Sequence, residues 1–171
     1  MLKYFLVGEM HGTQECPEVF FRIIQKKRIN QVALEFPSGY QKEIDEYFLS
    51  KRTLEDLSIF RLKKKTHDGR ASSAIKKLLE RLKRNNIKIY FVDEESFERD
   101  KLMAKNLSKI NGRIAFLCGN VHASKKEIIL PRLFLLLYNV KYFPNLSLHC
   151  IKALTLAPIL FLNFHLVDFL T

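Results

Sequence analysis

The sequence predicts an α/β fold: a single domain with a mostly parallel, doubly wound sheet flanked by helices. Two observations predict it. Four short apolar runs rich in strand-forming residues recur along the 171-residue chain, at residues 4–7, 31–34, 87–92 and 114–118. Segments with the apolar spacing of helices separate these runs. Strands that alternate with helices imply right-handed crossovers between parallel strands.

Local signals place the helices of the first half. Pro17 suits the first helical position after the first strand, and an apolar stripe follows it, made of Val19, Phe20, Ile23 and Ile24. Ser38 and Gln41 have the spacing of a capping box, which predicts a helix that carries Ile44, Tyr47 and Phe48. Thr53 is a candidate cap for a short helix with Leu57 and Phe60.

The second half has similar signals. Asp68 or Ser72 is expected to begin a helix whose apolar stripe contains Ile75, Leu78, Leu79 and Leu82. Residues 85–86, both asparagine, should stop this helix before the third strand. Residues 97–110 are expected to form a further helix that ends near residues 111–112, an Asn-Gly pair.

The chain changes character near residue 128. Residues 1–127 are predicted to form an α/β core of catalytic type. Residues 128–171 are strongly apolar, and their role stays open between completion of the sheet, membrane association and degenerate sequence. The uncharged stretch 153–167 is shorter than the roughly 20 apolar residues that a spanning helix needs, so a membrane partner is not expected.

The formal net charge of +11 does not predict a nucleic-acid partner. The excess of lysine and arginine lies in helix-like segments, at residues 26–28, 61–65 and 76–84, where it is typical of solvated helix faces. Residues 1–7 are too short for the apolar region of a signal peptide, so the expected compartment is the cytoplasm.

The three cysteines fit neither a disulfide framework nor a zinc site. Cys118 lies in a strand-like run and is predicted to be a buried thiol. Cys16 is predicted to be more exposed, because it precedes the first predicted helix.

Two copies of a Gly-x-x-His pattern point to a functional site. Residues 8–11 are Gly-Glu-Met-His, and residues 119–122 are Gly-Asn-Val-His. Each copy directly follows a predicted strand. A histidine just past the carboxyl end of a strand, with a glycine that turns the backbone, stands where open α/β sheets place ligands and catalytic groups.

The four predicted strands end in polar residues, which are Glu9 with His11, Glu35, Asp93, and Asn120 with His122. Parallel strands bring all their carboxyl ends to one edge, so these groups should converge. Carboxylates and imidazoles bind divalent metals or transfer protons. The candidate catalytic residues, which are also the candidate metal ligands, are therefore Glu9, His11, Glu35 and His122. Each has an alternative as a helix cap, an ion-pair partner or a structural histidine.

Four further residues are predicted to bind substrate: Asp68, Arg70, Arg99 and Asn120. A guanidinium near a carboxylate cluster orients a ligand or stabilises a developing oxyanion. The alternatives are a helix N-cap for Asp68 and a surface ion pair for Arg99.

Several segments together carry a family resemblance. They are residues 8–15 (Gly-Glu-Met-His-Gly-Thr-x-Glu), 33–35 (Ala-Leu-Glu), 99–107 (Arg-Asp-x-x-Met-Ala-x-Asn-Leu) and 119–123 (Gly-Asn-x-His-Ala). From about residue 4 to residue 124, the chain resembles the superfamily of erythromycin esterases, Tiki/TraB proteins and ChaN-type haem-binding lipoproteins. Residues 68–74 resemble a subgroup of its bacterial members.

The resemblance implies an α/β fold with the site at the strand ends. In the esterase branch it makes His11 the general base, and Glu9 and Glu35 orient that base or the substrate. His122 would hold or polarise the electrophile. In the Tiki branch, similar positions coordinate a divalent metal and the reaction is peptide hydrolysis. Manganese suits such Glu and His ligands.

The expected function is hydrolysis of an ester or amide bond in a small-molecule or peptide substrate. The alternative is a non-catalytic module that binds haem or another small ligand, as in the ChaN branch, with His67 or Tyr40 as an axial ligand. The chain is too short for the helical insertion of the esterases, so erythromycin is not the expected substrate. An inactive remnant is a third interpretation, and the oligomeric state is not predicted.

Overall fold

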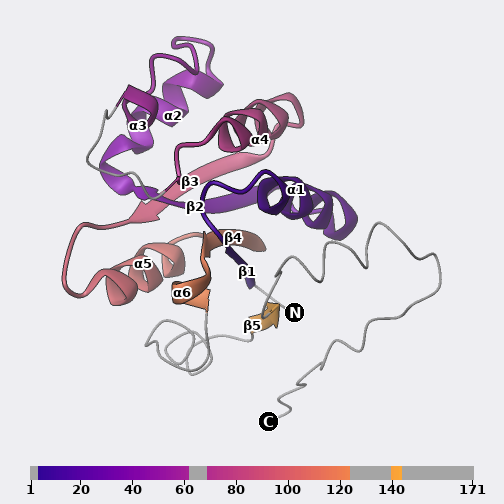
Figure 1. The fold of residues 1–171 in the computed structure, drawn as a ribbon, viewed down its shortest axis with the longest axis vertical. Helices are drawn as coiled ribbons and strands as arrows, with labels where there is room; N and C mark the ends of the chain where they lie inside the picture. Colours follow the sequence, from indigo (N-terminus) through magenta and orange to yellow (C-terminus); the bar gives the residue numbers. More distant parts are fainter. Residues whose placement is uncertain (1–3, 62–68, 124–139, 144–171) are drawn as a thin grey trace.

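The computed structural model describes residues 4–61, 69–123 and 140–143, and these form an α/β fold (Figure 1). All strand pairs in them are parallel, in one five-stranded sheet of order β3-β2-β4-β1-β5. The strands are β1 (Tyr4–Glu9), β2 (Gln31–Pro37), β3 (Lys88–Asp93), β4 (Ile114–Gly119) and β5 (Val140–Phe143). The helices are α1 (Glu15–Lys27), the 3-10 turn η1 (Ser38–Tyr40), α2 (Gln41–Phe48), α3 (Ser58–Arg61), α4 (Ser73–Arg84), α5 (Arg99–Ser108) and α6 (Asn120–Ala123).

The four predicted strands and the parallel sheet are confirmed. Each strand extends one to three residues further at its carboxyl end than the apolar run suggested, so that Glu9, Glu35 and Asp93 lie within strands. The predicted strands ended where the runs of apolar residues end. The observed strands continue into residues whose buried side chains are charged. The difference therefore marks the edge where the site lies.

Both faces of the sheet are covered, as the doubly wound prediction requires. One core combines β-strand side chains with the buried faces of α1, α2 and α4, and the other combines the opposite side chains with α5 and α6. Figure 1 shows α1 and α4 on one side of the sheet and α5 with α6 on the other. The chain moves outward from β1 through β2 to β3 and then returns to β4. Crossovers between parallel strands are right-handed as a rule, so the return in the opposite direction is expected to place α5 on the opposite face.

Two of the predicted helix boundaries are confirmed. The Ser72 side chain accepts a hydrogen bond from the Ile75 amide and caps α4. At the other end of α4, Asn85 is the C-cap residue and Asn86 adopts a positive φ of 53°. That left-handed conformation is one that asparagine tolerates better than most residues, and it turns the chain into β3.

The capping box predicted at Ser38 and Gln41 does not form. The Ser38 hydroxyl donates instead to the Glu94 carboxylate, at 2.6 Å. The Gln41 amide bridges to β3: its Nε2 donates to the Ile89 carbonyl at 3.1 Å, and its Oε1 accepts from the Phe91 amide at 2.7 Å. Both side chains satisfy polar groups of β3 and its exit, which lie next to them only in the folded chain.

Three smaller predictions are wrong. Thr53 forms a turn with Asp56 and does not cap α3, which begins only at Ser58. Phe97 lies outside α5, which begins at Arg99. Cys16 is buried, because α1 begins before Pro17 and already includes it. Cys118 is buried as predicted.

Only part of the apolar segment 128–171 can be described. Residues 140–143 form β5, which pairs with β1 at the edge of the sheet. The other predictions for this segment, and those for His67 and Asp68, fall outside the described residues. Within the described part of the chain, no helix has the length and apolar character needed to cross a membrane.

Candidate functional site

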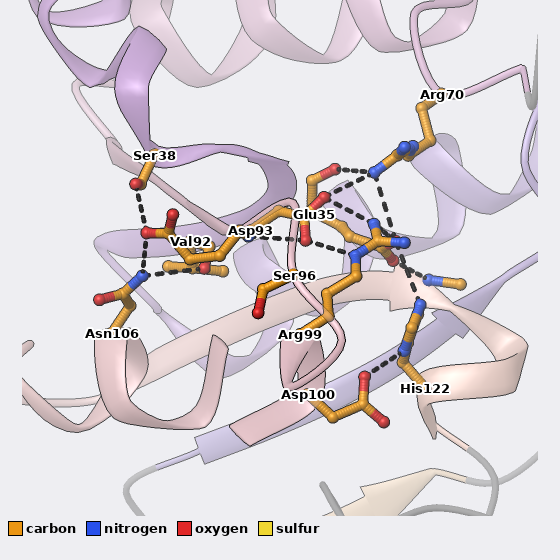
Figure 2. Close-up of polar contacts among 12 residues, drawn as sticks. Glu35, Ser38, Arg70, Val92, Asp93, Ser96, Arg99, Asp100, Asn106 and His122 are labelled. Carbon is orange, nitrogen blue, oxygen red and sulfur yellow. Dashed lines mark hydrogen bonds and ion pairs between the residues drawn. The ribbon is translucent and has the colours of Figure 1, made fainter. Parts of the chain in front are cut away.

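A network of charged side chains fills the carboxyl edge of the sheet. The predicted residues Glu9, His11, Glu35 and His122 lie there, together with Asp93, Arg70, Arg99 and Asp100. Figure 2 shows Glu35 between the two guanidinium groups, with His122 and Asp100 beyond them. The expected convergence of the strand ends is therefore confirmed, whereas the chemical roles of these residues stay predictions.

Glu35 is the centre of this network. It is only 4% exposed. Its Oε2 accepts a hydrogen bond from the Gly119 amide at 2.6 Å, and its Oε1 accepts one from Nη2 of Arg99 at 2.6 Å. The pairing of β2 with β3 becomes irregular just after Leu34, which ends the regular ladder where Glu35 enters the site. Such irregularities often re-aim a side chain beside a functional site.

The surroundings of Glu35 keep it ionised. Burial by itself would raise its pKa, because a charge loses hydration there. The hydrogen bonds from His122 and the Gly119 amide and the electrostatic attraction to His122 outweigh burial and lower the pKa to about 2. Glu35 is therefore a carboxylate at neutral pH and is not suited to donate a proton.

Asp93 shares its two arginines with Glu35. Nη1 of Arg70 lies 2.8 Å from Oδ2 of Asp93, and it also contacts the Glu35 carbonyl at 3.2 Å. Arg99 makes a two-pronged contact, with Nε 2.5 Å from Oδ1 and Nη2 2.6 Å from Oδ2 of Asp93. Burial lowers the pKa of Arg99, but its hydrogen bond and its attraction to Asp93 raise it above the usual value. Both arginines therefore hold the carboxylates as permanent cations.

His11 is arranged as a base. Its Nδ1 lies 2.9 Å from Oε1 of Glu9, which is buried. An ionised carboxylate only accepts hydrogen bonds, so Nδ1 carries the proton in the neutral ring and Nε2 keeps its lone pair. Nε2 faces Oε2 of Glu35 at 3.8 Å, beyond hydrogen-bond distance. The lone pair is thus directed towards the centre of the site.

The second motif glycine allows this approach. A Cβ atom added at Gly119 would lie 2.9 Å from Nε2 of His11 and 3.5 Å from Oε2 of Glu35. Any larger residue would displace the His11 ring. Gly119 therefore contributes to the site in two ways. Its amide donates to Glu35, and its lack of a side chain leaves room for the His11 ring.

His122 lies between two carboxylates. Its Nδ1 is 2.6 Å from Oδ1 of Asp100, and its Nε2 is 3.4 Å from Oε1 of Glu35. The contact with Glu35 raises the pKa of His122, burial lowers it, and the charges of Glu35 and Asp100 raise it further, so that the net pKa lies above the usual 6.5. The protonated form of His122 is therefore favoured by its two carboxylate neighbours.

A backbone contact positions Arg70. Gly12 and Gly69 both have positive φ, at 83° and 80°. A Cβ atom on Gly69 would lie 2.8 Å from both the amide nitrogen and the Cα of Gly12. Only glycine at residue 69 lets the two segments approach this closely, and Arg70 follows directly. The residue after the first histidine motif therefore helps to place the guanidinium on Asp93.

Asn120 begins α6 and packs against the first motif. Its Oδ1 would be only 2.5 Å from a Cβ atom at Gly8, so the two Gly-x-x-His segments touch here. Arg99 was predicted as a substrate-binding residue with a surface ion pair as the alternative, and its ion pair with Glu35 and Asp93 is partly buried. The substrate-binding roles of Arg70, Arg99 and Asn120 stay predictions.

Two acidic residues were missing from the set of predicted site residues. Asp93 is 1% exposed and pairs with both arginines, yet Glu94 and Glu95 made it hard to single out in the sequence. Its position at the end of a strand, like that of Glu35, was the available signal. Asp100 follows Arg99 directly, but nothing in its neighbourhood along the chain points to His122.

As arranged, these side chains do not fit the predicted metal site. Glu9 contacts the nitrogen of His11 that faces away from Glu35, and both Glu35 oxygens accept hydrogen bonds from Gly119 and Arg99. In the described ranges of the chain, no three His, Cys, Asp or Glu side chains are grouped so that they could hold a metal ion. The role of Glu9, His11, Glu35 and His122 as metal ligands stays a prediction.

The similarity of this chain to known proteins is weak. No protein-family model and no curated protein sequence matches the chain. A solved structure that is similar is described as "Crystal structures reveal a thiol-protease like catalytic triad in the C-terminal region of Pasteurella multocida toxin". The TM-score is 0.46 and the sequence identity 16%, and the match covers 68% of this chain and 19% of the toxin chain. This chain thus spans about a fifth of the toxin chain that it matches.

Proposed function

We propose that this protein is a hydrolase that cleaves an ester or amide bond with water activated by His11, as its resemblance to the erythromycin esterase, Tiki and ChaN superfamily implies. The observation that carries the proposal is the Glu9–His11 pair. Its 2.9 Å hydrogen bond holds the ring with Nε2 directed towards Glu35. This is the arrangement by which a carboxylate orients a histidine for general-base catalysis.

In the proposed reaction, Nε2 of His11 takes a proton from water as the water oxygen bonds to the substrate carbonyl carbon. The Nδ1–H bond to Glu9 stabilises the imidazolium that forms. When the bond from the carbonyl carbon to the leaving oxygen or nitrogen breaks, His11 returns the proton to the leaving group. The products are a carboxylic acid and an alcohol or amine, and His11 is regenerated.

The cationic side of the site would stabilise the oxyanion. Glu35 and Asp100 both favour the protonated form of His122, and its Nε2 is 3.4 Å from Glu35, at the long end of hydrogen-bond distances. A small movement would let Nε2–H donate to the developing oxyanion. Arg99 adds a permanent positive charge, while Glu35 and Asp93 keep both cations in place.

The proposal is tested with Glu9→Gln and His11→Ala. Because both remove the oriented base, we expect kcat to fall by about 10²- to 10⁴-fold in each. The assay uses a panel of p-nitrophenyl esters and fluorogenic peptide amides. Glu94→Gln is the matched control, since Glu94 lies at the exit of β3 and bonds Ser38 and Asn106, not His11. Equal turnover by His11→Ala and wild type would reject the assignment.

Two further measurements do not depend on finding a substrate. Nitrogen-15 NMR of the wild type should show His11 protonated at Nδ1, with the tautomer mixed in Glu9→Gln. Elemental analysis of the same samples tests the predicted metal, and a haemin titration tests the binding module. Stoichiometric metal lost in His11→Ala, or a Soret shift without hydrolysis, would replace the metal-free mechanism.

A further inference from the structure

The two histidines of the site are held by carboxylates in the same way. Oε1 of Glu9 lies 2.9 Å from Nδ1 of His11. Oδ1 of Asp100 lies 2.6 Å from Nδ1 of His122. In each ring the other nitrogen, Nε2, faces Glu35, at 3.8 Å from Oε2 in the first pair and at 3.4 Å from Oε1 in the second. Two carboxylate–histidine pairs therefore flank one buried carboxylate.

Asp100 reaches the second histidine from another element. His122 lies in α6, which directly follows β4, whereas Asp100 is the second residue of α5. The first residue of α5, Arg99, is bound to both Glu35 and Asp93. Figure 2 shows that Asp100 leaves the same turn in another direction, towards the ring of His122. The ion pairs of Arg99 therefore fix the turn that holds Asp100 against the ring.

The bond to Asp100 fixes the orientation of the His122 ring. An ionised carboxylate only accepts hydrogen bonds, so Nδ1 of the ring carries a proton. Half a turn of the ring about its Cβ–Cγ bond would put a carbon atom in the place of Nδ1 and would break this charge-assisted bond. The same turn would put a carbon atom in the place of Nε2. Asp100 therefore keeps Nε2 directed towards the centre of the site.

We propose that Asp100 is a positioning residue of the hydrolytic reaction, which holds Nε2 of His122 towards the substrate carbonyl as Glu9 holds Nε2 of His11. This inference rests on the proposed hydrolase function. The alternative role is structural, because an acidic residue in the first turn of a helix stabilises that helix by itself. The two roles differ in what a substitution of Asp100 does once His122 is absent.

A double-mutant cycle separates the two roles. In Asp100→Ala, kcat should fall by about 10²-fold, because an oxyanion donor that is misdirected is largely lost. KM should change little, since the carbonyl oxygen gains its charge only in the transition state. In the His122→Ala background, Asp100→Ala should have almost no further effect on kcat. A second large fall in the double variant would overturn the inference, because Asp100 would then act through the fold.

Two further variants sharpen the comparison. Asp100→Asn keeps the shape of the side chain and one acceptor oxygen, so its kcat should lie between those of Asp100→Ala and the wild type. Glu98→Ala is the matched control: Glu98 is the N-cap residue of α5, and its exposed carboxylate pairs with Lys101 at 2.9 Å and not with a histidine. Its kcat should stay close to that of the wild type. A fall equal to that of Asp100→Ala would contradict the positioning role, because the effect would belong to the end of the helix.

Nitrogen-15 NMR tests the contact without a substrate. The wild type should show Nδ1 of His122 protonated, with its proton shifted far downfield by the short bond to Asp100. Asp100→Ala should lose this signal, and Glu98→Ala should keep it. If the signals behave in this way but no ester or amide is cleaved, the contact stands, and the hydrolase proposal fails together with the catalytic part of this inference. If hydrolysis is observed and the signal is the same in Asp100→Ala, the positioning role alone is rejected.

Discussion

Glu35 shows how one buried charge organises its neighbours. It is almost fully removed from water, yet its two oxygens meet the Gly119 amide and the cationic groups of Arg99 and His122. Burial alone would favour the neutral acid, but these contacts favour the carboxylate by more. The ionised Glu35 in turn raises the pKa of His122. The two charges therefore depend on each other.

This dependence predicts how stability varies with pH. The pKa of Glu35 falls from 4.5 to about 2 on folding, so its contribution of about 3 kcal/mol is present above pH 4.5 and is lost as the pH falls towards 2. The pKa of His122 is raised above 6.5, so its contribution is present below pH 6.5 and is lost as the pH rises through the raised value. Together the two groups favour a maximum between pH 4.5 and 6.5.

Urea unfolding from pH 2.5 to 9 measures both losses. Each group shifts the pKa of the other. Glu35→Gln and His122→Gln should therefore each reduce both the stability lost at acid pH and the stability lost at alkaline pH. The control, Glu98→Gln, removes an exposed carboxylate whose partner is Lys101. This variant should lose stability at acid and at alkaline pH as the wild type does. The two groups would not be coupled if a variant at Glu35 or His122 abolished the loss of stability at one end of the pH range and left the loss at the other end unchanged.

At the scale of elements, the site depends on how strands and connections end. The strand ladder between β2 and β3 becomes irregular after Leu34, and Glu35 stands at that point. The connection before α4 contacts the loop after β1 through Gly12 and Gly69 and delivers Arg70. The edge is therefore shaped by two backbone features as much as by its charged side chains.

Gly69→Ala is expected to break the contact that places Arg70. The new Cβ would lie 2.8 Å from Gly12 in a backbone with φ of 80°, so the free energy of unfolding should fall by about 1–3 kcal/mol. Hydrolysis should fall as well, since Arg70 loses its place on Asp93. Chemical denaturation and kinetics on the same samples provide both measurements.

Gly39→Ala is the control for this substitution. No heavy atom lies within 4 Å of a Cβ placed at Gly39, so its effect on unfolding should stay within about 0.5 kcal/mol. An equal effect of the two substitutions would show that the Gly12–Gly69 contact does not constrain the chain.

The whole molecule is a sheet with a core on each face. Leu79 of α4 belongs to one core and Met103 of α5 to the other, and both are fully buried. Because the strands between them contribute side chains to both sides, the two cores should unfold together. The charged edge is held where these layers meet, so losing either layer should dismantle it.

Leu79→Ala and Met103→Ala test this coupling. Each should lower the free energy of unfolding by about 2–5 kcal/mol, because each leaves a cavity in a packed core. Denaturation followed by circular dichroism and by tyrosine fluorescence should give one coincident transition in both variants. Leu49→Ala, at an exposed position, should change stability little. Separate transitions in Met103→Ala would mean that the α5 face folds independently.

The local pattern of the sequence was enough to predict the strands, the doubly wound arrangement and the convergence of Glu9, His11, Glu35 and His122. Runs of apolar residues and the handedness of crossovers are properties of short segments, and parallel strands bring their carboxyl ends to one edge wherever they stand in the sheet. Ser72 and Asn86 were predicted for the same reason, since capping and left-handed turns involve neighbours along the chain.

Only the tertiary structure decided the partners of each charge. Arg99 contacts Glu35 across 64 positions of sequence, the Gly119 amide contacts it across 84, and Asp100 contacts His122 across 22. Ser38 and Gln41 serve β3 instead of a capping box for the same reason. These pairings follow from the strand order β3-β2-β4-β1, and an alternation of strands and helices does not specify that order. The sequence by itself determined which groups stand at the edge, and packing determined which of these groups contact one another.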